Sequence, residues 1–211
     1  MHRLRPLHII DAELNLVRRE LISRRLLWNA EIYNKIPPNN RGGRTGKMAH
    51  DAVMLKYLSI STCHMQRRNC ALTDCDAKSC YDRVLPHILS LCYSKLGLPD
   101  STCLWLSRAL VNMKYYVQTS HGVSQGTSQS DQDGMVFGVG QGATDKPTGW
   151  LFISAFLSHL YDSEANGSFL YDPQDLVKLA WSHVLFVDDA CLLYTSPSPR
   201  DRTRSRMPSS A

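Results

Sequence analysis

The chain has 211 residues, of which 43% are hydrophobic and 20% charged, a balance that can bury a core and excludes a disordered chain. No apolar run approaches the roughly 20 residues of a membrane span, and the first ten residues lack the apolar stretch of a secretion signal. We therefore predict an intracellular protein, in the nucleus or the cytoplasm, without a membrane partner.

The net charge of +5 is unevenly distributed along the chain. Residues 191–211 carry four arginines and one aspartate, which leaves 20 basic and 18 acidic residues for the rest. Charge alone therefore gives little support for nucleic-acid binding. None of the seven cysteines forms a C-x-x-C pair, so we expect buried thiols in a reducing compartment, with a metal or redox site as the alternative.

The first part of the chain is predicted to be helical. Residues 11–34 have the apolar periodicity of an amphipathic helix, with Leu14, Val17, Leu21 and Trp28 on one face and Asp11 as N-cap. Pro, Asn and Gly make residues 35–46 a loop. A second helix is expected over residues 45–58, with Thr45 as its cap.

Helices and strands are mixed in the remainder. Three more helices are predicted from apolar periodicity, at residues 82–96 (closed by Gly97), 100–113 and 144–164. Four strands are predicted from short apolar or alternating runs, at residues 70–77, 114–120, 134–140 and 183–187. Without a regular βαβ alternation, this order indicates an α+β fold with helices packed on an antiparallel sheet.

Carboxylates terminate two of the predicted strands. Asp74 and Asp76 end the first and point to the same face, because strand residues alternate; Asp188 and Asp189 end the second. Such clustering raises carboxyl pKa values unless cations compensate it, and a pair of Mg²⁺ (or Mn²⁺) ions would supply both the compensation and nucleotidyl-transfer chemistry. The alternative is that Asp188 and Asp189 only form a polar hairpin turn.

Five motifs occur in an order that resembles the polymerase domain of reverse transcriptases, particularly those of eukaryotic retrotransposons. The catalytic motifs of that family are similar to "DAKSCYD" (76–82), "GQGATDKP" (140–147) and "FVDD" (186–189), and its fingers motifs to "RPLHIIDAELN" (5–15) and "RGGRTGKMAHDAV" (41–53). The resemblance covers roughly residues 3–190. It implies a right-hand polymerase fold with a fingers segment (1–70), an incomplete palm (71–190) built on an antiparallel sheet packed with helices, and no thumb.

The resemblance also implies an activity and partners. Asp76 and Asp188 would ligate two Mg²⁺ ions, with Asp189 supporting them, in an RNA-directed DNA polymerase that acts on an RNA template, a DNA primer and deoxynucleoside triphosphates. We expect the fragment itself to have little or no activity. The alternatives are an RNA-dependent RNA polymerase palm and a catalytically dead, nucleic-acid-binding remnant of a retroelement.

The same resemblance assigns residues to substrate and template. Tyr81 would exclude a ribose 2′-hydroxyl, unless its ring is ordinary packing. Gln141 and Gly142 would lie against the incoming nucleotide, where glycine lets the backbone approach closely; serving a turn is the alternative. The triphosphate would be held by Arg5 and, more weakly, Arg3, and the template by three residues that could equally be solvated loop charges: Arg41, Arg44 and Lys47.

Three further residues are notable in the sequence: Lys146, His159 and His183. Lys146 stands where the family has a small serine, and it could pair with Asp145 or Asp162 or indicate a degenerate element. His159 and His183 lie in apolar stretches, where a hydrogen-bonded core histidine is expected.

Residues 191–211 do not continue the family pattern. The match is to translated DNA. One reading frame of a transposase mosaic end used in sequencing libraries encodes "CLLYTS". "PSPRD" matches the adjoining adaptor, and "SRMPSSA" matches the flow-cell primer. We therefore predict that 191–211 is a translated, disordered adaptor tail without biological function. A basic nucleic-acid-binding tail is the alternative.

Overall fold

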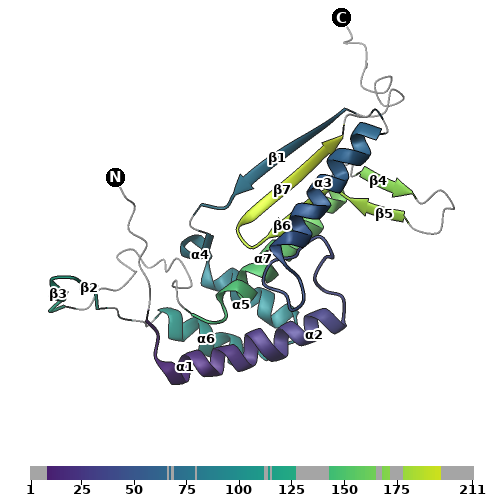
Figure 1. Ribbon diagram of the computed structural model, residues 1–211. Coiled ribbons are helices and arrows are strands. Elements are labelled where there is room, and N and C mark those ends of the chain that lie inside the picture. Colours follow the sequence, from purple (N-terminus) through teal and green to yellow (C-terminus); the bar gives the residue numbers. More distant parts are fainter. Residues whose placement is uncertain are drawn as a thin grey trace, which may run out of the picture. The chain divides into compact units, whose positions relative to one another are not determined.

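The computed structural model describes residues 9–65, 67, 69–78, 80–111, 114, 116–126, 143–164, 168–171 and 178–195 (Figure 1). The chain divides into two compact units, the first formed by residues 1–36 and 78–153 and the second by residues 37–77 and 154–211. Helices and antiparallel strands are mixed, which confirms the predicted α+β class. Both units draw on both sides of residue 70, so the division into fingers and palm at that residue stays a prediction.

The first unit begins with the predicted long helix, which runs through α1 (Ala12–Arg18), the π-helical segment η1 (Arg19–Leu26) and α2 (Leu27–Ile32). Asp11 caps it as predicted, because its carboxylate accepts hydrogen bonds from the backbone N–H groups of Glu13 (3.0 Å) and Leu14 (3.1 Å).

The buried face of this helix differs from the predicted one. Arg18, Ile22, Leu26 and Ala30 are buried at four-residue spacing, whereas Trp28 is 66% exposed. The π-helical stretch is wider per turn than an α-helix, so the inward face departs from the 3.6-residue period used for the prediction.

The described residues in the rest of the first unit form helices and one small hairpin. Its elements are α4 (Cys80–Arg83), α5 (Pro86–Lys95), α6 (Asp100–Val111), the strands β2 (Gln118–Thr119) and β3 (Gly122–Val123), and the start of α7 (Lys146–Glu164). Gly97 closes α5 as predicted, at φ +101°. Tyr93 packs edge-on against Phe152, with ring centroids 6.1 Å apart, which joins α5 to α7. The predicted strand at 134–140 lies outside the described residues.

The second unit is built on a three-stranded antiparallel sheet in the order β1 (Cys70–Asp76), β7 (Asp189–Thr195), β6 (His183–Phe186). Leu193 and Val184 are buried against Ala52, Leu55 and Leu72, so α3 (Ala49–Met65) covers one face of the sheet (Figure 1). Strand β1 was predicted to be buried, but all of its residues except the half-buried Leu72 are exposed.

Residues 191–195 correct the prediction of a disordered tail from residue 191. They belong to β7, which pairs with β1 over seven residues and with β6 over four. Cys191 and Leu193 lie on the same face of β7, because strand residues two apart share a face, and Leu193 is 1% exposed on the face that α3 covers. Residues 196–211 lie outside the described part of the chain.

Several other boundaries differ from the predicted ones. The helix predicted at 82–96 is divided into α4 and α5, and of the strand predicted at 114–120 the structure describes β2 alone. Helix α3 begins four residues after the predicted start, where the Asp51 carboxylate accepts a hydrogen bond from the Met48 N–H (2.8 Å). A hairpin of β4 (Ser168–Tyr171) and β5 (Lys178–Trp181) was not predicted. No helix in the described ranges is long and apolar enough to cross a membrane.

Candidate functional site

The predicted catalytic residues lie at one end of the sheet in the second unit. Asp76, the last residue of β1, is the direct partner of Asp189, the first residue of β7. The Ala77 N–H donates to the Asp188 carbonyl (2.9 Å), which ties the end of β1 to the loop between β6 and β7. Residues 113 positions apart in sequence are therefore brought together by backbone pairing.

The loop of this hairpin is conformationally demanding. Phe186 and Asp189 pair with each other, which leaves only Val187 and Asp188 between β6 and β7. Val187 has φ +54°, a value that β-branched residues rarely adopt. A two-residue antiparallel hairpin requires such a conformation, and strained positions of this kind concentrate at functional sites.

Residues 39–42 support the hairpin from the side of β6. The Leu185 N–H donates to the Asn39 carbonyl (3.0 Å) and the Arg41 N–H to the Leu185 carbonyl (2.8 Å). Gly42 lies so close to the loop that a Cβ atom there would be 2.1 Å from the Val187 nitrogen. The predicted template-binding loop is thus also a structural support for the acidic hairpin.

The three basic residues of this loop differ from one another in burial and in hydrogen bonding. The Arg44 guanidinium donates through Nη1 to the carbonyls of Pro37 (3.0 Å) and Asn40 (2.9 Å), so it holds the loop together. Arg41 is half-buried and Lys47 is exposed. Their contact with a template stays a prediction.

A pocket of about 430 Å³ lies between α3 and the acidic end of the sheet. Small α3 residues, Ala49 and Ala52, leave this space open, and Asp76 and Asp189 line it. Carboxylate oxygens beside an open space are the donor set that Mg²⁺ prefers, so Asp76 and Asp189 fit the implied metal chemically, whereas Asp188 does not line this pocket. Among the residues that the structure describes, no three His, Cys, Asp or Glu side chains are grouped to hold one ion, and the two-metal site stays a prediction.

Lys56 on α3 and Asp74 on β1 form an ion pair on this side of the sheet, with Nζ 2.5 Å from Oδ2. The hydrogen bond from Lys56 lowers the pKa of Asp74 below its usual value, and the same bond raises the pKa of Lys56. Burial, followed by the neighbouring Asp74, raises the pKa of Cys191 to about 11. The Cys191 thiol is therefore protonated and unreactive at neutral pH.

In the first unit, Tyr81 lies on α4 beneath a lysine side chain. The Lys146 ammonium is 5.7 Å from the centroid of the Tyr81 ring, and Lys146 is 4% exposed. The two carboxylates predicted to pair with Lys146 have other partners: Asp145 pairs with Arg18, and Asp162 accepts a hydrogen bond from Ser182.

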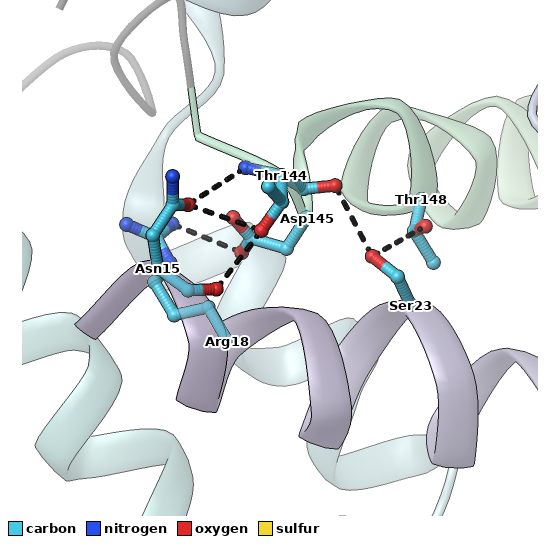
Figure 2. Close-up of polar contacts among 6 residues, drawn as sticks. All are labelled: Asn15, Arg18, Ser23, Thr144, Asp145 and Thr148. Carbon is cyan, nitrogen blue, oxygen red and sulfur yellow. Dashed lines mark hydrogen bonds and ion pairs between the residues drawn. The ribbon is translucent and has the colours of Figure 1, made fainter. Parts of the chain in front are cut away.

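A polar cluster, which we call the α1 latch, joins the start of the long helix to residues 144–148 (Figure 2). It comprises Asn15, Arg18, Ser23, Thr144, Asp145 and Thr148. The Arg18 guanidinium lies 2.9 Å from the Asp145 carboxylate, and their side chains are 4% and 2% exposed. The Thr144 N–H donates to Asn15 Oδ1 (3.0 Å) and its hydroxyl to the Asn15 carbonyl (3.0 Å). The latch thus fixes residues 144–148, and it was not predicted from the sequence.

His183 is the hydrogen-bonded core histidine that was predicted. Its ring contacts the hydroxyls of Ser158 (2.5 Å) and Ser182 (2.8 Å), and Asp162 lies 3.3 Å from Nδ1. Burial lowers the pKa of His183 more than Asp162 raises it, so the ring is neutral at pH 7. The prediction for His159 was wrong, because that side chain is exposed on α7.

Four predicted substrate-binding residues lie outside the described part of the chain: Arg3, Arg5, Gln141 and Gly142. Their roles stay predictions.

The mixed helices and antiparallel strands are consistent with a polymerase-like fold. The likeness is to the solved structure of telomerase from Candida albicans in complex with a TWJ fragment of telomeric RNA, with a TM-score of 0.53 over 90% of this chain at 13% sequence identity. This chain spans 32% of that protein, and the likeness concerns the fold alone. No protein-family model and no curated protein matches the chain.

Proposed function

We propose that the chain is part of an RNA-directed DNA polymerase, a nucleotidyltransferase of a retrotransposon-type element. The observation that carries this proposal is the pairing of Asp76 with Asp189, next to the bond from Ala77 to Asp188, on a strained two-residue hairpin. The fold likeness to telomerase, itself a reverse transcriptase, supports the same class of enzyme.

In the proposed reaction, the primer 3′-hydroxyl attacks the α-phosphate of a deoxynucleoside triphosphate and pyrophosphate leaves. Two Mg²⁺ ions, when bound, would activate the attacking oxygen and neutralise the leaving group. Asp76 and Asp188 would hold the ions and Asp189 would support them. Most of the protein's contribution is positioning, for which the pairing of β1 with β7 offers a rigid base.

Substrate recognition would come from elsewhere in the chain. Tyr81 would select the deoxyribose by excluding a 2′-hydroxyl, and Gln141 and Gly142 would lie against the nucleotide. Arg5, with Arg3, would hold the triphosphate, whose oxygens match the arginine fork. The RNA template and DNA primer would be the macromolecular partners.

The first test is metal binding by the 211-residue chain, measured by electron paramagnetic resonance of Mn²⁺ and by Mg²⁺ competition. Asp76→Asn and Asp188→Asn are expected to weaken Mn²⁺ binding at least tenfold, because each removes a charged oxygen ligand. Glu164→Gln is the matched control, since it removes one exposed carboxylate from the same unit. Equal Mn²⁺ binding by all three variants would refute the proposed site.

The second test separates the enzyme from its alternatives. Binding of an RNA–DNA template–primer is measured by fluorescence anisotropy, and single-nucleotide addition is measured with dATP and ATP. The protein tested is extended to the full genomic reading frame. If it binds the template–primer but adds no nucleotide, it is a catalytically dead remnant. Equal use of both nucleotides by that protein would identify an RNA-dependent RNA polymerase.

A further inference from the structure

Lys146 occupies a position that two local rules disfavour. It is the first residue of α7, where the helix dipole repels a cation, and its side chain is almost fully buried. A buried ammonium is costly unless its surroundings compensate it. The face of an aromatic ring offers such compensation, and the Tyr81 ring lies beneath this ammonium.

The backbone on either side of Lys146 is fixed by the α1 latch. Thr144 is bonded to Asn15, and Asp145 is paired with Arg18 (Figure 2). One turn further on, the Thr148 hydroxyl donates to Ser23 (3.2 Å). Lys146 therefore projects from an anchored segment and cannot easily follow a movement of its aromatic partner.

Tyr81 is held less firmly by its own element. Helix α4 has only four residues, too few for a helix to be stable by itself. Its neighbours Cys80 and Val84 are buried, but Tyr81 itself is only half-buried. The rotation of the Tyr81 ring therefore depends on contacts from outside α4, and Lys146 supplies one of them.

We propose that Lys146 is a positioning residue that fixes the Tyr81 ring and thereby sharpens the selection of deoxynucleotides over ribonucleotides. This proposal rests on the proposed function, in which Tyr81 touches the sugar. It assigns to Lys146 a role that requires the cation and the ring together, and to the α1 latch the role of holding the cation in place.

The test measures equilibrium binding and needs no chemistry. The chain is mixed with a template–primer that ends in a dideoxynucleotide opposite a templating uridine, and the Kd values of dATP and ATP are compared. Lys146→Met keeps the apolar stem and is expected to lower the ratio Kd(ATP)/Kd(dATP) roughly tenfold, about 1.4 kcal/mol, within the range of a desolvated cation–π contact. Lys146→Arg keeps the cation and is expected to keep the ratio at its wild-type value.

Three further variants make the result specific. Lys114→Met removes an exposed lysine from the same unit and should leave the ratio unchanged. Tyr81→Ala should abolish discrimination, and adding Lys146→Met to it should have no further effect, because both residues act through one ring.

The outcomes distinguish this inference from the proposed function. A wild-type chain that prefers dATP, with Lys146→Met unchanged, would overturn the role of Lys146 and leave the polymerase proposal intact. A folded wild-type chain that binds neither nucleotide would overturn both. A fall in the ratio that Lys146→Arg does not reverse would also overturn the inference, because it would indicate a packing defect.

Discussion

The Arg18–Asp145 pair gives the sharpest stability prediction. The two groups are 2.9 Å apart and almost fully buried. Asp145→Asn would leave the Arg18 guanidinium buried without its counter-charge, which typically costs about 3–5 kcal/mol of unfolding free energy. For a chain of this size, such a loss corresponds to a fall in Tm of roughly 6–20 °C.

Replacing both partners should behave differently from replacing one. Arg18 Nε and Asp145 Oδ1 have no hydrogen-bond partner among the described residues, so the pair does not fully compensate the burial of its polar atoms. Arg18→Met combined with Asp145→Leu is therefore expected to recover most of the stability that either single change loses.

The assay is urea unfolding followed by the fluorescence of the four tryptophans. Glu20→Gln is the matched control, because it breaks an exposed ion pair with Arg24 (2.8 Å) on the same helix, and such pairs contribute only about 0.3–0.5 kcal/mol. If Asp145→Asn costs no more than Glu20→Gln, the reasoning about the buried pair is wrong.

Three more predictions concern the second unit. Gly42→Ala places a methyl group 2.1 Å from the Val187 nitrogen. It should therefore lower the free energy of unfolding in urea by about 1–3 kcal/mol and weaken Mn²⁺ binding. Gly126→Ala is the control and should do neither, because a Cβ atom there meets nothing within 4 Å. Burial lowers the pKa of His183. The contribution of this residue to stability should therefore be complete above pH ~6.5, the pKa of histidine in the unfolded chain, and should fall as the pH drops below that value. His183→Gln should flatten the dependence of stability on pH between pH 8 and 5, and a flat dependence for the wild-type chain would contradict this. Sequencing the source locus without transposase should give codons after 190 that differ from those of residues 191–211, whereas the same codons in genomic DNA would disprove the adaptor origin.

The elements that could be predicted from the sequence were those with a strong local pattern. Residues 144–164 and 183–187 had unambiguous apolar runs, and Asp11 was a readable cap, so these predictions are confirmed. The inward face of the first helix could not be predicted, because nothing local in the sequence announces the π-helical turns that rotate it.

In the candidate site, too, only the features with a local sequence pattern could be predicted. Carboxylates at strand ends were predicted from local patterns, but the pairing of Asp76 with Asp189 was not, because it depends on the return strand β7 that the sequence did not predict. The α1 latch had no such signal, because Arg18 and Asp145 are 127 positions apart and each is an ordinary polar residue in its own segment. Only the tertiary structure reveals that Asp145 is the partner of Arg18 and that Lys146 lies over Tyr81.

The exposed edge of β1 has a consequence for how the protein must be handled. Cys70 and Cys75 lie on this strand as exposed free thiols, and β1 pairs on one side only among the described strands. Unpaired edges recruit each other between molecules, and thiols held side by side in that way oxidise to intermolecular disulfides. Samples stored in air should therefore form covalent dimers that a phosphine reductant reverses, and every metal titration proposed above should be run with that reductant present.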